Sequence, residues 1–302
     1  MKISAVINTY NEESNLPRCL NAVLGVVSEI VIVDMGSTDQ TLKIAKQFGA
    51  RIYKHPYVGY VEPARNLGLE KAKGDWILLL DADELISDFF LQKLIGLAQN
   101  GAYQFVRIPR KNIIFDKWIG HTGWWPDYQI RFFKKNAVSW GEEIHSIPLT
   151  QGSGFDLSIE EKNALTHYHY QTISQFIERM NRYTSIEAEY KHKTEGEIDR
   201  RMFLSSPFHE FLSRFFAQKG YKDGLHGLVL SILQGISVFV VMTKVWEKQK
   251  FLSPTEQEIL SLVQDQSQEL GSELSHWQFE SQTKDISRIE RLVLKLRKRL
   301  FI

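Results

Sequence analysis

The chain has 302 residues, 43% of them hydrophobic, which is enough for one large α/β domain with an appendage or for two modest domains. Its 37 Lys and Arg residues nearly balance 36 Asp and Glu residues, so the composition lacks the basic excess of a nucleic-acid-binding protein and predicts no such partner. The single cysteine, Cys19, excludes an internal disulfide and a cysteine-based metal site, and its apolar helical setting indicates a core residue.

The first half of the chain alternates short apolar runs with helical patterns, which is typical of a mostly parallel sheet covered by helices. Because a strand is expected almost at the first residue, no secretion signal is predicted. Four strands are predicted at residues 3–8, 29–34, 50–55 and 76–81, and the helices between them at 15–26, 39–49 and 63–72. A helix at 88–99 and short strands at 103–109, 128–134 and 137–140 follow.

From about residue 174 the chain is expected to be mainly helical. Residues 227–246 carry no charge before Lys244, and we expect them to form a buried or interfacial helix rather than a membrane span. The polar segment from residue 253 ends in apolar positions three and four residues apart, which predict an amphipathic helix: Ile286, Ile289, Val293, Leu296 and Leu300. The predicted regions are 1–170, 171–252 and 253–302.

Polar residues follow three of the predicted strands. They are Asn8, Thr9, Tyr10, Asn11 and Glu12 after the first strand, Asp34 after the second, and Asp81, Asp83 and Glu84 after the fourth. In open α/β sheets, ligands bind at the carboxyl ends of the strands, so this pattern predicts a binding site there. A strand-terminal Asp alone is more often a turn former or a helix cap.

The run Trp76 to Glu84, WILLLDADE, ends in three carboxylates within four residues. Adjacent ionised carboxylates repel each other, and burying them without partners is costly. Hard divalent cations prefer oxygen ligands, and Mg²⁺ in particular binds one or two carboxylates together with substrate phosphates. We therefore interpret the missing positive charge as Mg²⁺ or Mn²⁺ delivered with a diphosphate.

Four motifs in this order resemble glycosyltransferase family 2, especially bacterial glucosyltransferases of the lipopolysaccharide core: VINTYNEESNLPRCL, EIVIVDMGSTDQT, ARNLGLEKAKGDWILLLDADE and WWPDYQIRFFKK. The resemblance implies an α/β fold of GT-A type, with a Rossmann-like, mostly parallel sheet flanked by helices and followed by a helical C-terminal region. It also implies a UDP-sugar donor and a divalent metal. The implied nucleotide-sugar contacts are Asn8, Thr9, Tyr10, Glu12, Asp34, Arg65, Asn66 and Asp81, and the implied metal ligand is Asp83.

Asp127 is the candidate base that takes the proton of the acceptor hydroxyl in an inverting transfer. Trp124 and Trp125 precede it, and their rings are suited to stacking on sugars. A carboxylate beside apolar rings has its charged form disfavoured, so the pKa of Asp127 is predicted to rise. The alternative is that Asp127 forms an ion pair with Arg131.

A second acidic cluster contains Glu142, Glu143 and His145. Glu143 is a reserve candidate for the base, and His145 is a candidate metal or diphosphate ligand. His167 and His169 occur in the sequence HYHY, and on a strand they would face one side with no third ligand in sight. We interpret those two histidines as structural.

The sequence thus predicts an inverting, metal-dependent glycosyltransferase that moves a hexose, with glucose expected, from a UDP-sugar to a hydroxyl of a cell-envelope glycolipid or polysaccharide precursor. The absence of G-x-G-x-x-G after the first strand argues against a dinucleotide-dependent oxidoreductase. A non-catalytic assembly protein that oligomerises through its C-terminal helix is the alternative. The basic terminal helix favours a cytoplasmic protein attached to the inner face of the membrane. The same helix could alternatively pair with a second copy of the chain to form a homo-oligomer.

Overall fold

The computed structural model describes residues 1–141, 147–196 and 198–283. The chain divides into two compact units. The first, here called the sheet unit, contains Met1–Gly120 and Trp124–Gln171. The second, the helical unit, contains His121–Gly123 and Thr172–Ile302.

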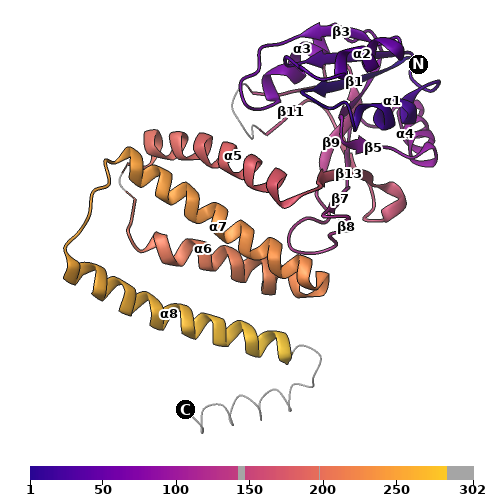
Figure 1. The fold of residues 1–302 in the computed structure, drawn as a ribbon. Coiled ribbons are helices and arrows are strands. Elements are labelled where there is room, and N and C mark those ends of the chain that lie inside the picture. The colour runs from indigo at the N-terminus through magenta and orange to yellow at the C-terminus, as the bar shows by residue number, and fades with distance from the viewer. Residues whose placement is uncertain (142–146, 197, 284–302) are drawn as a thin grey trace. The chain divides into compact units, whose positions relative to one another are not determined.

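The sheet unit, coloured indigo to magenta in Figure 1, is built on a seven-stranded sheet with the order β12-β6-β9-β4-β1-β2-β3. Strands β4, β1, β2 and β3 are parallel neighbours, and β9 runs antiparallel to β4 and β6. The element order confirms the predicted β-α-β-α-β-α-β beginning. The structure adds that the fourth of these strands, β4, pairs with the first. The strands are β1 (Ile3–Thr9), β2 (Glu29–Asp34), β3 (Arg51–Lys54), β4 (Trp76–Asp81), β6 (Phe105–Ile108), β9 (Gln129–Lys134) and β12 (Gly154–Asp156).

Helices cover the sheet because its central strands are apolar on both faces. Alternate residues of β4 point to opposite sides, so Leu78 and Leu80 belong to one core cluster and Ile77 and Leu79 to another. The first cluster also contains residues of α1 (Leu16–Val23) and α4 (Asp88–Asn100), and the second packs against Leu69 of α3 (Glu62–Lys71). Helix α2 (Thr41–Gln47) precedes β3.

Gly68 allows α3 to lie close to the sheet. A Cβ atom at this position would lie 2.5 Å from Cγ1 of Val6, whereas a Cβ atom at Gly96 of α4 would meet nothing within 4 Å. We expect Gly68→Ala to lower the free energy of unfolding by about 1–3 kcal/mol through overpacking. The matched variant Gly96→Ala should raise that free energy by about 0.4–1 kcal/mol. Urea unfolding of both variants tests this, and equal effects would contradict it.

A smaller sheet in the same unit has the order β5-β13-β7-β8. Its strands are β5 (Glu84–Leu85), β13 (Leu165–Tyr170), β7 (Arg110–Ile114) and β8 (Lys117–Trp118), and β10 (Val138–Ser139) pairs with β11 (Leu149–Thr150). The antiparallel pairing of β5 with β13 places His167 opposite Glu84. A strand far along the chain thereby reaches the acidic turn after β4.

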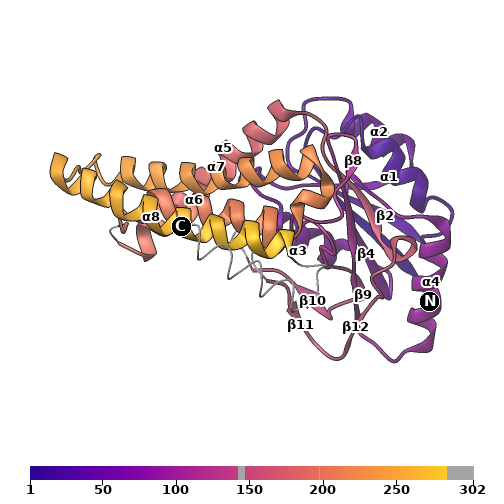
Figure 2. The ribbon, with the colours of Figure 1, turned by 90° about the horizontal axis from the view of Figure 1, so that it is seen from below.

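The helical unit contains α5 (Ile173–Thr194), α6 (Met202–Leu212), α7 (Leu225–Lys248) and α8 (Glu256–Gln282). Helix α7 packs against α5 and α6, and α6 packs against α8 (Figures 1 and 2). Small residues allow the close approach of α6 and α7, since a Cβ atom at Gly235 would lie 2.7 Å from the carbonyl oxygen of Pro207. Helix α8 begins with a capping box formed by Thr255 and Glu258.

Residues 121–123 belong to the helical unit through buried Asp223. The Asp223 carboxylate accepts hydrogen bonds from the backbone nitrogen of His121 at 3.0 Å and from the hydroxyl of Thr122 at 2.8 Å. The ring of His121 lies 3.1 Å from the same carboxylate. Asp223 therefore holds this short segment in place.

Helix α7 is long and apolar enough to cross a membrane by length and composition, and one third of its most apolar window is buried within the structure. The predicted apolar stripe from Ile286 to Leu300 lies outside the described residues.

Candidate active site

The three polar strand ends meet at one edge of the main sheet. In the register of the parallel strands, Thr9 lies opposite Asp34, and Asn8 lies opposite Asp81. Strand β1 is therefore the centre of the site, with β2 and β4 on its two sides. The sheet order brings together residues 8, 34 and 81, as the position of the strand ends in the sequence predicts.

Asn8 and Asp34 differ in how far their polar groups are already satisfied. Asn8 is 5% exposed, and within the described chain its amide oxygen and nitrogen have no hydrogen-bond partner. Asp34 accepts bonds from the Thr9 hydroxyl at 3.1 Å and from the backbone nitrogens of Gly36 and Ser37 at 3.0 and 3.1 Å. Asp34 thus stabilises the turn after β2. Because buried polar groups are normally hydrogen-bonded, the buried amide of Asn8 is expected to bond a ligand or a water molecule.

Tyr10, Glu12 and Asn66 have partners of their own. The ring of Tyr10 stacks on that of Tyr57 with a centroid separation of 4.1 Å. The Glu12 carboxylate accepts a bond from the Asn15 amide at 2.9 Å, at the start of α1. Asn66 bonds the backbone of Trp140 in both directions, at 2.8 and 3.0 Å. Its amide therefore holds that loop, and the predicted contact of Asn66 with a nucleotide stays a prediction.

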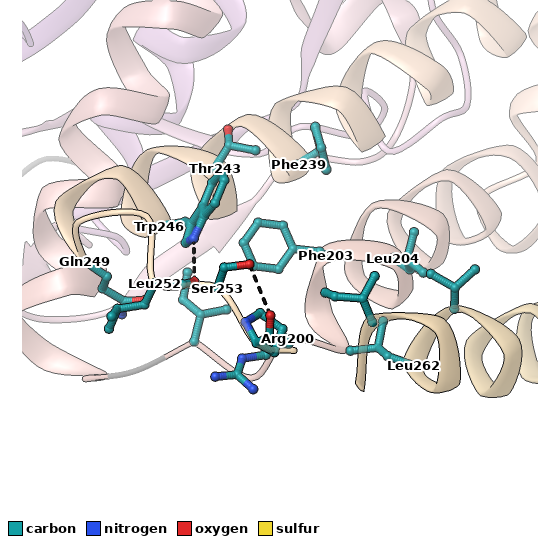
Figure 3. A pocket seen from close by; sticks show the side chains of 14 residues that line it. Arg200, Phe203, Leu204, Phe239, Thr243, Trp246, Gln249, Leu252, Ser253 and Leu262 are labelled. Carbon is teal, nitrogen blue, oxygen red and sulfur yellow. Dashed lines mark hydrogen bonds between the residues drawn. The ribbon is translucent and has the colours of Figure 1, made fainter. Parts of the chain in front are cut away.

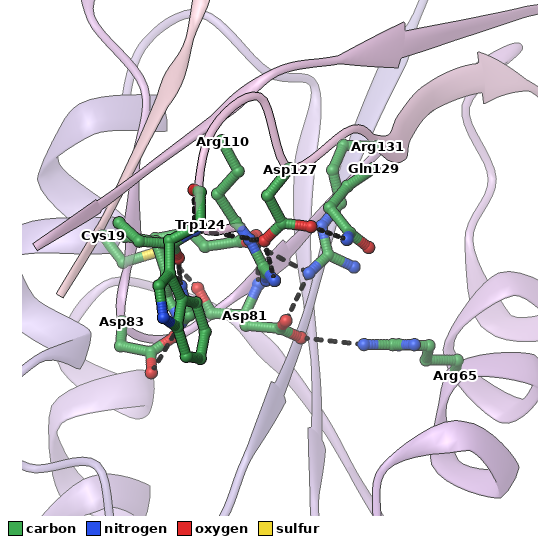
Figure 4. A network of polar contacts seen from close by, with 12 residues as sticks. Cys19, Arg65, Asp81, Asp83, Arg110, Trp124, Asp127, Gln129 and Arg131 are labelled. Carbon is green, nitrogen blue, oxygen red and sulfur yellow. Dashed lines mark hydrogen bonds and ion pairs between the residues drawn. The ribbon is translucent and has the colours of Figure 1, made fainter. Parts of the chain in front are cut away.

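An alternating chain of acidic and basic side chains crosses the site (Figure 4). Arg131, which is 1% exposed, bonds Asp81 and also Glu84, the latter at 2.8 Å. Arg110 lies 3.2 Å from Glu84 and 2.5 Å from Asp127. Arg65 completes the chain with a 3.4 Å contact to Asp81.

The sequence interpretation assigned the missing positive charge beside the DADE run to a metal, whereas arginines supply part of that charge. Asp81 and Glu84 already have guanidinium partners. Burial alone would raise the pKa of Asp81, but the charges of Arg131, Arg65 and Arg110 outweigh it and hold the pKa below its usual range. Removing a partner from a buried ion pair costs about 3–5 kcal/mol, so Arg131 is also important for folding.

Asp83 has a different neighbour. Nε2 of His167 lies 3.3 Å from Oδ2 of Asp83, and Nδ1 of His167 lies 2.6 Å from the amide oxygen of Asn112. The sequence interpretation of His167 and His169 as structural, made because no third ligand was in sight, did not foresee this neighbour. The pairing of β5 with β13, which no local sequence pattern shows, brings the two residues together.

The pair formed by Asp83 and His167 fits a divalent cation that is completed by its substrate. Within the described chain, no cluster of at least three His, Cys, Asp or Glu side chains is arranged to hold a metal. A carboxylate and an imidazole are suitable ligands for Mn²⁺, and phosphate oxygens commonly complete such sites. Burial and the neighbouring carboxylates raise the pKa of the Cys19 thiol, which disfavours the thiolate form that binds metals.

Asp127 is held by three side chains. Its Oδ2 accepts bonds from Arg110 at 2.8 and 2.5 Å and from Asn112 at 3.2 Å, and its Oδ1 accepts one from Gln129 at 2.8 Å. Burial would raise the pKa of Asp127, but Arg110 and these hydrogen bonds lower it below the usual range. The predicted rise is therefore wrong, and the partner is Arg110 rather than Arg131.

The tryptophans around Asp127 pack with other aromatic rings. Trp125 meets Trp118 edge to face with a centroid separation of 5.5 Å, and Trp124 meets His169 at 5.2 Å. The carbonyl of Trp124 accepts a bond from Asn112, which also bonds Asp127. Asn112 thus links the aromatic loop to the candidate base. Glu142, Glu143 and His145 lie outside the described residues.

The model of the family described as "Glycosyl transferase family 2" matches residues 4–155, half of the chain. The chain belongs to this family. It is accordingly a glycosyltransferase, and the predicted GT-A type of fold, with a mostly parallel sheet and a helical C-terminal region, is confirmed.

Curated relatives align over most of their own length. An uncharacterized glycosyltransferase of Rickettsia typhi is 27% identical over 82% of this chain and 87% of the relative. The lipopolysaccharide core biosynthesis glycosyltransferase LpsC of Rhizobium meliloti is 24% identical over 82% of this chain and 93% of the relative. Among solved structures, S. aureus TarS 1–349 is 18% identical, with a TM-score of 0.43, over 84% of this chain and 93% of TarS.

Proposed function

We propose that this glycosyltransferase moves a hexose from a UDP-sugar to a hydroxyl of a cell-envelope glycolipid or polysaccharide precursor, with inversion at the anomeric carbon and with a divalent cation. The arrangement of Asp81, Asp83 and Asp127 in one polar network at the carboxyl ends of the central strands is the main support. The lipopolysaccharide core function named for the Rhizobium relative supports the class of acceptor.

The charge of the network supports the need for a cation. Three guanidinium groups, of Arg65, Arg110 and Arg131, face the four carboxylates of Asp81, Asp83, Glu84 and Asp127. Without counting His167, one negative charge remains, and a diphosphate would add more. Like charges in a partly buried site repel strongly. A bound Mg²⁺ or Mn²⁺, held by Asp83 and His167, would neutralise the diphosphate and stabilise the charge on its leaving oxygen.

The residues of the donor side have distinct roles in this proposal. The unsatisfied amide of Asn8 bonds the nucleotide, and Tyr10 offers a ring face to the base. Arg65 and Asp81 contact the diphosphate and the ribose or sugar, while Thr9 and Asp34 hold the turn that shapes the pocket. Asn66 positions the loop at Trp140, and Glu12 anchors the start of α1.

Asp127 acts as the base on the acceptor side. Its lowered pKa keeps the carboxylate ionised, so Asp127 is available as a proton acceptor at neutral pH, although its basicity is low. As the acceptor hydroxyl attacks, its proton moves to Oδ1, the oxygen that accepts only the Gln129 bond among the described residues. Arg110 remains on Oδ2 and keeps the carboxyl group oriented.

The experiment measures UDP release from a panel of UDP-sugars with Mn²⁺, first alone and then with a membrane glycolipid extract. We expect one UDP-hexose to react faster than the others and the extract to increase its turnover. NMR of the product should show inverted anomeric configuration. Retention of configuration, or turnover of a donor that is not a UDP-sugar, would contradict the proposal.

A further inference from the structure

The helical unit contains an apolar pocket of about 410 Å³, remote in sequence from the strand-end site (Figure 3). Its walls come from α6, α7 and α8 and include Phe203, Leu204, Phe239, Trp246, Ile259 and Val263. The volume lies within the range of sites for small molecules. The pocket is thus large enough for a ligand and is lined mostly by hydrocarbon.

Two polar groups that α7 contributes to the walls already have partners. The Trp246 indole donates to the carbonyl of Leu252 at 2.8 Å, and the Thr243 hydroxyl donates to the carbonyl of Val240 at 2.9 Å. A sugar or nucleotide would leave its own hydroxyls without partners among these walls, which is costly. The interior therefore favours a hydrocarbon ligand.

The pocket continues into an exposed apolar stripe on α7. Ile232, Ile236 and Phe239 are exposed and lie four and three residues apart, and the next positions of the same face, Thr243 and Trp246, line the pocket. A stripe that runs into a pocket fits an elongated chain better than a compact molecule. Each methylene that such a chain buries contributes about 0.8 kcal/mol.

Positive charge lies at the edge of the pocket. The exposed side chain of Arg200 is part of the lining. Among the described residues, Arg200 forms no ion pair. Glu258, an acidic neighbour of Arg200, is bonded to Thr255 in the cap of α8. The edge therefore complements a negatively charged headgroup.

We infer that this pocket binds one acyl chain of an anionic phospholipid of the membrane, with Arg200 beside the phosphate. The stripe on α7 then contacts the bilayer beside the bound lipid, and α7 lies at the membrane surface. This inference does not depend on the donor or the acceptor of the transfer reaction.

The test uses the full chain and monomeric lysophosphatidylglycerol with a brominated acyl chain, because bromine quenches a neighbouring indole. We expect saturable quenching of fluorescence that is lost in Trp246→Phe, and weaker binding of the zwitterionic lysophosphatidylcholine with the same chain. In Ile259→Glu the binding should weaken at least about tenfold, since the hydrocarbon would then face an ionised carboxylate.

Ile177→Glu is the matched control, because Ile177 of α5 is 40% exposed, Ile259 is 41% exposed, and Ile177 does not line the pocket. Its lipid affinity should stay within about twofold of the native value, because a surface substitution away from the ligand has little effect. UDP binding should be unchanged in both variants, which separates this test from that of the transferase site.

Three results would overturn the inference. The first is unsaturable quenching, or equal quenching in the native chain and Ile259→Glu. The second is lipid binding that appears only after Leu296→Asp, which would assign the pocket to the chain's own C-terminal segment. The third is a dimer in sedimentation that Ile259→Glu dissociates without any change in lipid binding, which would assign the pocket to a second copy.

Discussion

Replacing Asp83 with alanine should reduce turnover of the UDP-sugar at least about a hundredfold, because metal-assisted stabilisation of a leaving group contributes several kcal/mol. His167→Ala should act in the same direction, since its Nε2 lies 3.3 Å from the Asp83 carboxylate. In both variants the concentration of Mn²⁺ that gives half-maximal activity should rise. Steady-state kinetics over a range of Mn²⁺ concentrations measures both effects.

Asp88→Ala is the control for this pair, because Asp88 lies in the first turn of α4 outside the polar network. Its turnover should remain near the native value. If Asp83→Ala lost turnover but kept the native dependence on Mn²⁺, Asp83 would not be a metal ligand. If His167→Ala left the Mn²⁺ dependence unchanged, the histidine would be structural, as the sequence suggested.

Asp127→Asn should lower kcat by about a hundredfold to ten-thousandfold, the usual contribution of a positioned general base. Affinity for UDP should change little, because Asp127 bonds Arg110, Asn112 and Gln129 rather than the strand-end residues of β1. Gln129→Ala removes a single hydrogen bond to the same carboxylate and should have a much smaller effect. Equal losses of kcat in the two variants would contradict a role for Asp127 as base.

The pH dependence gives a second test of Asp127. The pKa of Asp127 is lowered in the folded protein. Its carboxylate therefore stays ionised as the pH falls to about 4, the ordinary pKa of an aspartate, and becomes protonated only at lower pH. Removing the charge of Arg110 with Arg110→Met should raise that pKa, so the loss of kcat on acidification should begin at a higher pH. An unchanged pH profile in Arg110→Met would contradict the assignment.

Much of the fold was predictable because the central strands are uniform apolar runs and the helices between them have clear periodicity. Strand β4 ends at Asp81 as predicted, and α3 spans Glu62–Lys71 where residues 63–72 were expected. The carboxyl ends of parallel strands lie at one edge of a sheet, so the polar residues that end these strands were expected to lie together. This predicted the position of Asn8, Asp34 and Asp81 from the sequence. The helical second half was likewise visible from its composition.

The charge partners were not predictable, because they depend on pairing between distant strands. Arg110 lies 17 residues before Asp127 in the sequence, and His167 reaches Asp83 through the small sheet. Apolar rings near Asp127 suggested a raised pKa, but Arg110, together with hydrogen bonds from Asn112 and Gln129, outweighs the effect of burial on that pKa. Local sequence patterns indicate which residues lie at the end of a strand. The pairing of strands that are far apart in the sequence determines which side chains contact each carboxylate.

Calorimetric titration of the native chain with UDP, with and without Mn²⁺, tests most directly whether the site at the strand ends binds a nucleotide diphosphate together with a cation. The excess of carboxylates over guanidinium groups predicts that UDP binds well only when Mn²⁺ is present. The same titration of Asp83→Ala should then show weak binding under both conditions. Equal affinity for UDP with and without Mn²⁺, or no binding in either case, would contradict a metal-dependent UDP-sugar transferase.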